Sequence, residues 1–183
     1  MKRIIIFFLI LLIFIPASAA GNVTIKGVDF EIPKAYEHGT LKESSYVYQS
    51  GFKFRILALD DYKNLKFNYG SDISEAKSYS HTNIAGHDAV KVSGEYDSVP
   101  HTTVYFVTGD MIYLICFNDT YVNDEITGII SKTPAQNISG DEFYATLDYA
   151  FQDYQKQLED ENARYDSYQQ SQHNRPVNRY FFF

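Results

Sequence analysis

Three histidines are the side chains whose type and placement favour chemistry most directly. His81, His87 and His101 stand near the ends of strands that the sequence predicts, in a chain with five histidines. Imidazole nitrogens bind zinc, and a carboxylate such as Asp88 or Asp97 would complete a hydrolytic site. Zinc sites usually show close ligand spacing, and these histidines do not. Scattered surface histidines are therefore the favoured interpretation, and a metal-dependent hydrolase is the alternative.

Other catalytic patterns are absent from the sequence. The adjacent carboxylates Asp60–Asp61 and Asp124–Glu125 do not predict a general acid and base, because such a pair must converge in a cleft. No serine has the G-x-S-x-G setting of a hydrolase nucleophile, and no glycines form a phosphate-binding loop. We therefore predict no catalytic residue, no cofactor and no enzymatic activity.

Cys116 is the only cysteine of the chain. It follows Ile115 and precedes Phe117, and no histidine is near it in sequence. A reactive thiol is one interpretation, and a small hydrophobic residue inside the core is the favoured one.

The elements that must position any site are strands, and three of them are predicted between His87 and Phe117. Polar and apolar residues alternate from Val90 to Tyr96, as a half-buried strand requires. Gly109–Asp110 predicts a two-residue hairpin turn, because glycine readily adopts the positive φ of such turns. This turn would pair Val107 with Ile112. The apolar run Met111–Phe117 predicts a strand covered on both faces.

Flanking segments predict further strands and helices around this sheet. Strands are predicted at 23–25, 28–33, 46–48 and 52–56, with Lys53 and Arg55 of the last strand facing water. Residues 60–70 are interpreted as a loop, with a short helical turn as the alternative. Asp72–Glu75 is interpreted as the capping box of a short helix ending before His81. A helix after Asn123 and a longer amphipathic helix after Ser139 complete an α+β fold, an antiparallel sheet flanked by helices.

The first residues have the pattern of a secretory signal peptide. A cationic head, the apolar run 4–15 and the small residues Ala17–Ser18–Ala19 predict export with cleavage after Ala19. A retained membrane anchor is the alternative, but twelve apolar residues rise only about 18 Å as a helix. The predicted organisation is a signal peptide at 1–19, an α+β domain at 20–138, a helix at 139–166 and a disordered tail at 167–183.

Charge and composition restrict the partners. The formal charge is −7, and loss of Lys2 and Arg3 would leave 14 basic against 23 acidic residues, a charge of −9. Such a chain is a poor ligand for nucleic acid or anionic lipid. We expect no membrane span after signal cleavage, and a protein or another component of the cell envelope as partner.

Two further groups of residues are candidate modification or interaction sites. Sequons at Asn22, Asn118 and Asn137 fall where loops or a terminus are predicted, so an exported chain would expose them to glycosylation. The chain has 16 tyrosines and 14 phenylalanines, and those outside the predicted core are candidates for docking. These docking candidates are Tyr165, Tyr168, Tyr180, Phe181, Phe182 and Phe183.

Four phrases of the sequence resemble a known family. They are FEIPKAY (residues 30–36), IAGHDAVKVSGEY (84–96), VTGDMIYLICF (107–117) and DEITGIISKT (124–133). They are similar to the PsbP/Mog1-like domains, in particular the DcrB-like and small secreted proteins of methanogenic archaea. The resemblance covers roughly residues 23–133 and implies an antiparallel sheet flanked by helices. It also implies a binding or assembly role, and it transfers no functional residue.

These observations together favour an exported, non-enzymatic binding or interaction module at the cell surface or envelope. The alternative is a metal-dependent extracellular hydrolase that uses His81, His87 and His101.

Overall fold

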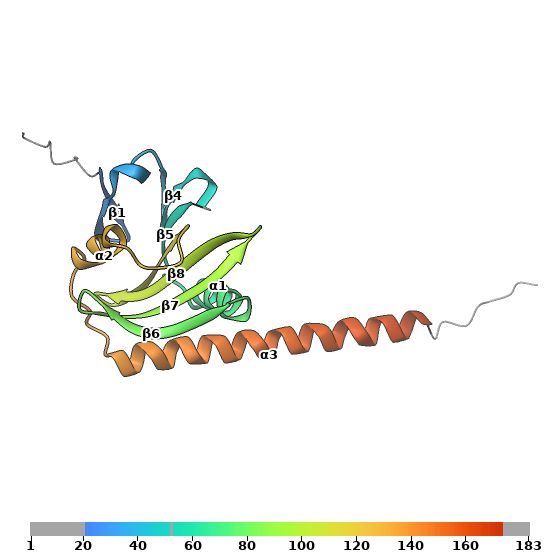
Figure 1. Cartoon of the computed structure of the whole chain (residues 1–183). Helices are drawn as coiled ribbons and strands as arrows, with labels where there is room; N and C mark the ends of the chain where they lie inside the picture. The colour runs from blue at the N-terminus through green and yellow to red at the C-terminus, as the bar shows by residue number, and fades with distance from the viewer. Residues whose placement is uncertain (1–20, 52, 174–183) are drawn as a thin grey trace, which may run out of the picture.

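The computed structural model describes residues 21–51 and 53–173, and Figure 1 shows their arrangement. The strands are β1 (Gly21–Ile25), β2 (Val28–Ile32), β3 (Thr40–Lys42), β4 (Ser45–Tyr48), β5 (Phe54–Ala58), β6 (Ser78–Ile84), β7 (His87–Tyr96), β8 (Val99–Thr108) and β9 (Met111–Phe117). The helices are α1 (Tyr62–Ser74), α2 (Asp124–Ser131) and α3 (Gly140–His173), with short 3-10 helices η1 (Lys34–Tyr36) and η2 (Gln49–Gly51).

Seven strands form one antiparallel sheet in the order β3-β4-β5-β9-β8-β7-β6. This sheet and its flanking helices confirm the α+β prediction. The turn at Gly109–Asp110 joins β8 to β9, and Val107 pairs with Ile112 as the sequence indicated. The strand β9 lies between β5 and β8. It is therefore the strand through which the two halves of the sheet are joined.

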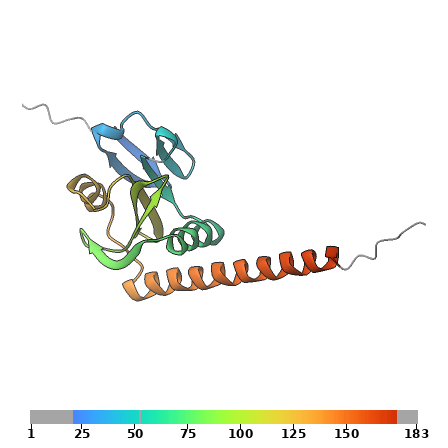
Figure 2. The same ribbon diagram turned by 45° about the vertical axis from the view of Figure 1, so that its right-hand side comes forward.

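Each face of the sheet has its own core, because side chains alternate along a strand. On one face, Phe106 and Tyr113 pack with residues of the β1–β2 hairpin and of α2. On the other face, Tyr105 and Leu114 pack with residues of α1 and α3. Figure 2 shows α2 on one side of the sheet, and α1 beside the first turns of α3 on the other.

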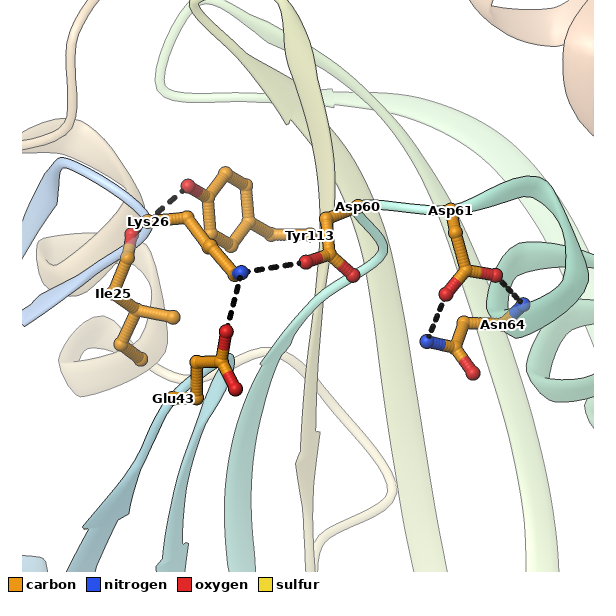
Figure 3. A network of polar contacts seen from close by, with 7 residues as sticks. All are labelled: Ile25, Lys26, Glu43, Asp60, Asp61, Asn64 and Tyr113. Carbon is orange, nitrogen blue, oxygen red and sulfur yellow. Dashed lines mark hydrogen bonds and ion pairs between the residues drawn. The ribbon is translucent and has the colours of Figure 1, made fainter.

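Polar contacts join the β1–β2 hairpin to the main sheet (Figure 3). The Tyr113 hydroxyl donates a 3.0 Å hydrogen bond to the carbonyl oxygen of Ile25. Lys26 Nζ lies 2.8 Å from an Asp60 carboxylate oxygen and 3.5 Å from one of Glu43. The hydrogen bond from Lys26 lowers the pKa of the Asp60 carboxyl. The hairpin is thereby held where β5 leads into α1.

The helix α1 corrects the prediction of a loop between Asp60 and Gly70. Asp61 is its N-cap and accepts a 2.7 Å hydrogen bond from the Asn64 backbone N–H. Leu65, Tyr69 and Ile73 recur at every fourth position and are buried. Between these positions, the exposed aromatic residue Phe67 and the helix-disfavouring Gly70 hid the helical period, since the hydrophobic pattern is the main sequence signal.

The predicted capping box at Asp72–Glu75 is also wrong. Asp72 lies in the last turn of α1, and Glu75 is its C-cap. The following residues form β6, an edge strand that pairs with β7. Most of its side chains are exposed, so it lacks the hydrophobic alternation that would predict a strand.

The helix α3 begins where it was predicted and ends later. Ser139 Oγ accepts a hydrogen bond from the Glu142 backbone N–H, and Phe143, Leu147 and Ala150 are buried under the sheet. A Cβ atom on Gly70 would lie 2.3 Å from the Tyr154 ring, so this glycine allows α1 and α3 to approach closely.

The distal part of α3 corrects the predicted disordered tail. Every residue from 159 to 170 is exposed, and Figure 1 shows this part of the helix leaving the domain. The helix nevertheless continues through residues 167–173. Residues 167–173 lack a hydrophobic face. They include three glutamines, which favour a helix by intrinsic propensity, and no glycine or proline. Residues 174–183 lie outside the described ranges.

The predicted signal peptide, residues 1–19, also lies outside the residues that the structure describes. Among residues 21–51 and 53–173, no helix combines the length and hydrophobicity needed to cross a bilayer.

Replacing Tyr113 by Phe should lower the free energy of unfolding by about 0.5–1.5 kcal/mol, the net contribution of one hydrogen bond. The substitution removes the bond between the Tyr113 hydroxyl and the carbonyl of Ile25. Urea denaturation followed by circular dichroism measures the effect, and Tyr121→Phe, at an exposed position, should leave stability unchanged. Equal stability of the two variants would contradict the role of this bond.

Deleting residues 167–183 should change the free energy of unfolding by less than about 0.5 kcal/mol, as for changes at exposed positions. Residues 167–170 are exposed. Phe143→Ala serves as the opposite control, with an expected loss of about 3–5 kcal/mol. A loss of that size in the deletion variant would show that the tail packs on the domain.

Candidate functional site

A cavity of about 560 Å³ lies at the C-terminal end of α1, on the face of the sheet that this helix covers. Its floor comes from β5, β9 and β8, and its walls come from the end of α1 and from the β7–β8 turn. The lining residues are Gly51, Arg55, Asp72, Glu75, Glu95, Tyr96, Asp97, Val99, His101, Thr103, Cys116 and Asn118.

Strand register places the floor residues in one row. Arg55 of β5 pairs with Cys116 of β9, and Cys116 pairs with Thr103 of β8. Side chains of directly paired residues point to the same face of a sheet. His101 lies two residues before Thr103 and therefore extends the row along β8 on this same face.

A glycine makes room for the His101 ring. Gly94 of β7 pairs with His101, and a Cβ atom on Gly94 would lie 3.2 Å from the ring carbon Cε1. A larger residue at this position would require the imidazole to shift by a few tenths of an ångström. The ring is thus seated against the sheet beside the cavity.

Two nitrogen atoms of the lining are buried without a hydrogen-bond partner in the described part of the chain. They are Arg55 Nε and His101 Nδ1. Leaving a buried donor or acceptor unpaired costs about 1–3 kcal/mol, so such atoms are rare unless a ligand or water satisfies them. Arg55 and His101 both line the same cavity, which is why we take it as the candidate site.

Carboxylates form the opposite wall. Asp72 accepts a 2.7 Å hydrogen bond from the Tyr105 hydroxyl, whose pKa burial raises well above its usual value. Glu95 lies 2.5 Å from Lys77. Within the described ranges, no ion pair or side-chain hydrogen bond engages Glu75 or Asp97. The wall is therefore acidic, with two carboxylates available to a ligand.

Cys116 packs against the core under α1 and α3, as the sequence predicted. Its side chain is nevertheless partly exposed and lines the cavity. Burial is still the largest influence on the thiol and raises its pKa, against the smaller effects of Arg55 and Thr103. A raised pKa keeps the thiol protonated at neutral pH, which disfavours the thiolate that nucleophilic catalysis needs.

Arg55 is the lining residue that the sequence placed wrongly. Its alternation with Phe54 and Ile56 predicted a side chain in water, but both faces of β5 are covered. Leu57, on the same face as Arg55, packs against the core under α1 and α3. An apolar residue on the supposed solvent face was the available signal that this face is covered.

The three candidate metal ligands do not converge. His87 is buried on the face that α2 covers and donates a 2.8 Å hydrogen bond from Nδ1 to the Val107 carbonyl. His81 stacks on Tyr144 of α3 at a centroid distance of 4.2 Å. It shares a face with His101, but the strand register separates them by four residues, about 13 Å along the strands. The described residues contain no group of three or more His, Cys, Asp or Glu side chains that could hold a metal ion.

The other candidate residues lie elsewhere on the surface. Asn22, Asn118 and Asn137 are all exposed, although Asn22 lies in strand β1 rather than in a loop. Tyr165 and Tyr168 lie on the projecting part of α3, with exposed fractions of 63% and 59%. The remaining docking candidates, Tyr180 to Phe183, lie outside the described residues.

A second hollow, of about 420 Å³, lies along α1 and α3. Its lining consists of long charged or polar side chains, and two of them, Lys66 and Asp153, form an ion pair at 3.2 Å. Its charges are thus partly neutralised by each other, and it offers no buried unpaired atom.

The rim of the cavity is a strained turn. Asp97 and Ser98 join β7 to β8 with φ values of 49° and 65°. The turns at Lys26–Gly27 and Ala85–Gly86 use the same left-handed conformations but place glycine second. A left-handed conformation costs a non-glycine residue about 1–2 kcal/mol.

Ser98→Gly should therefore raise the free energy of unfolding by about 0.5–1 kcal/mol, because relief of this strain outweighs the added entropy of the unfolded chain. Urea denaturation measures the change. Ser80→Gly in the extended strand β6 is the matched control and should lower stability by about 0.5–1 kcal/mol. The same sign in both variants would contradict the strain.

Comparison of the chain with protein-family models, with curated proteins and with solved structures found no match. The resemblance to PsbP/Mog1-like domains is thus not confirmed. The α+β fold with its seven-stranded antiparallel sheet is established by the structure.

Proposed function

We propose that this protein is an exported, non-enzymatic binding module of the cell surface or envelope that holds a small ligand in the cavity beside Arg55 and His101. The observation that carries the proposal is that two residues lining one cavity, Arg55 and His101, each have a buried nitrogen without a partner among the described residues. A volume of about 560 Å³ falls within the range of about 300–1,000 Å³ typical of small-molecule sites. The signal-peptide pattern at residues 1–19 supports export.

Binding rather than catalysis is favoured by the chemistry of the lining. The Cys116 thiol has a raised pKa, so it is poorly suited to act as a nucleophile. The histidines of the alternative hydrolase lie on two faces of the sheet. No observation favours that alternative.

We also propose that the domain is of the PsbP/Mog1-like type. The four sequence phrases support this assignment, together with the order of a hairpin, a meander from β7 to β9 and the helix α2. A binding or assembly role is what that resemblance implies.

Cys116 provides a test, because it is the only cysteine and it lines the cavity. The raised pKa makes this thiol react slowly with N-methylmaleimide at about pH 7, so excess reagent is used and intact mass is followed over hours. A ligand in the cavity should slow the reaction further. The panel comprises amino acids, short peptides, sugars, polyamines and dicarboxylates. We expect at least one class to slow the reaction fivefold or more, on the order of the occupancy reached at several times Kd.

The matched control carries Cys116→Ser together with Ser80→Cys, which moves the thiol to the exposed edge strand β6. Ligands of the cavity should leave the rate of this variant unchanged. If no class of compound protects Cys116, or if protection is equal in the control, the proposed binding function is wrong.

A further inference from the structure

The cavity has a positive side and a negative side. Arg55 is the only arginine or lysine among its lining residues. Within the described part of the chain no carboxylate forms an ion pair with it, and its Nε is buried without a partner. A half-buried guanidinium of this kind is a ready site for a carboxylate, which it binds through several N–H donors.

The negative side lies across the floor, at the end of α1 and the β7–β8 turn. Glu75 and Asp97 offer unpaired carboxylates there, and Glu95 adds a third, paired with Lys77. The C-terminal end of α1 contributes the negative end of its helix dipole at the same place. An ammonium group is the ligand group that these charges favour.

The sheet keeps the two sides apart. The strands β5 and β7 are three steps apart in the sheet, because β9 and β8 lie between them. The row of Arg55, Cys116 and Thr103 continues to Val92 of β7, and the end of α1 with Glu75 lies over Gly94, two residues farther along that strand. At about 4.8 Å a step and about 3.3 Å a residue, the backbones at Arg55 and Gly94 are about 16 Å apart, and side chains reaching inward shorten the gap to on the order of 10 Å. Asp97 lies three residues beyond Gly94 and is out of reach of a ligand of that length. Opposite charges in one cavity that do not neutralise each other are then free to bind a ligand with both charges.

Length selects among such ligands. One residue spans at most about 3.6 Å, so the charged groups of a free amino acid are too close to reach both sides. An extended tripeptide spans about 10 Å between its ends. Its peptide groups would lie over His101 and Asn118, whose side chains offer hydrogen-bonding atoms on the way across.

We infer that the ligand is a short peptide with free ends, whose carboxylate binds Arg55 and whose ammonium group binds Glu75. This inference rests on the proposed binding function and assigns the chemical class of its ligand.

The test compares triglycine with its N-acetylated and C-amidated forms in the Cys116 protection assay at about pH 7, where a peptide amine is mostly protonated. Triglycine should protect, and blocking either end should weaken the apparent affinity about 10- to 100-fold, as for loss of a hydrogen bond to a charged group. Equal protection by all three forms would overturn the inference.

Variants identify which residue binds each end of the peptide. Arg55→Gln should weaken the binding of triglycine and should remove the preference for triglycine over its amidated form. Glu75→Gln should remove the preference for triglycine over its acetylated form. Glu75 is exposed, so its variant tests the inference even if Arg55→Gln does not fold. Lys53→Gln, at an exposed position two residues before Arg55, should change neither preference. Unchanged end discrimination in Glu75→Gln would overturn the assignment of the ammonium group.

Failure of this inference differs from failure of the proposed function. If another class in the panel protects Cys116 and triglycine does not, the cavity binds a ligand and the peptide assignment is wrong. If no compound protects Cys116, both are wrong.

Discussion

Burial of β9 on both faces is the constraint on which the rest of the structure depends. This strand pairs with β5 and β8. Its side chains point alternately into two separate cores, Tyr113 toward α2 and Leu114 toward α1. Covering both faces requires the β1–β2 hairpin and α2 on one side and α1 with α3 on the other. A one-residue change of register would exchange the two sets of side chains, so the pairing is strongly specified.

The cavity lies where α1 stops covering the sheet. The helix α1 has 13 residues and is about 20 Å long, and it ends at Ser74 before reaching the last pairs of β9. Beyond it, the row formed by Arg55, Cys116 and Thr103 faces a space that no helix fills. Polar residues occupy the row there because a wet or ligand-filled space favours them over the apolar residues found under α1. Fold and candidate site thus have one origin, a sheet longer than the helix that covers it.

The sequence predicted the parts of this fold that carry a clear period or turn. The β8–β9 hairpin, the cap of α2 at Asn123 and the start of α3 at Ser139 were all identified correctly. The helix α1 and the strand β6 were missed because neither shows a clean hydrophobic pattern. The site itself was not predictable, since it depends on strand order. Arg55 and His101 are 46 positions apart in sequence. They line one cavity because β5 and β8 are both neighbours of β9 in the sheet.

A crystal structure of the protein with triglycine tests the central claim most directly. The peptide should lie extended across the floor, with its carboxylate about 3 Å from a nitrogen of the Arg55 guanidinium and its ammonium group beside Glu75. His101 Nδ1 should gain a hydrogen-bond partner from the peptide or from a bridging water. A peptide bound in the reverse direction, a peptide bound elsewhere, or an Arg55 side chain paired with a carboxylate of the protein itself would contradict the claim.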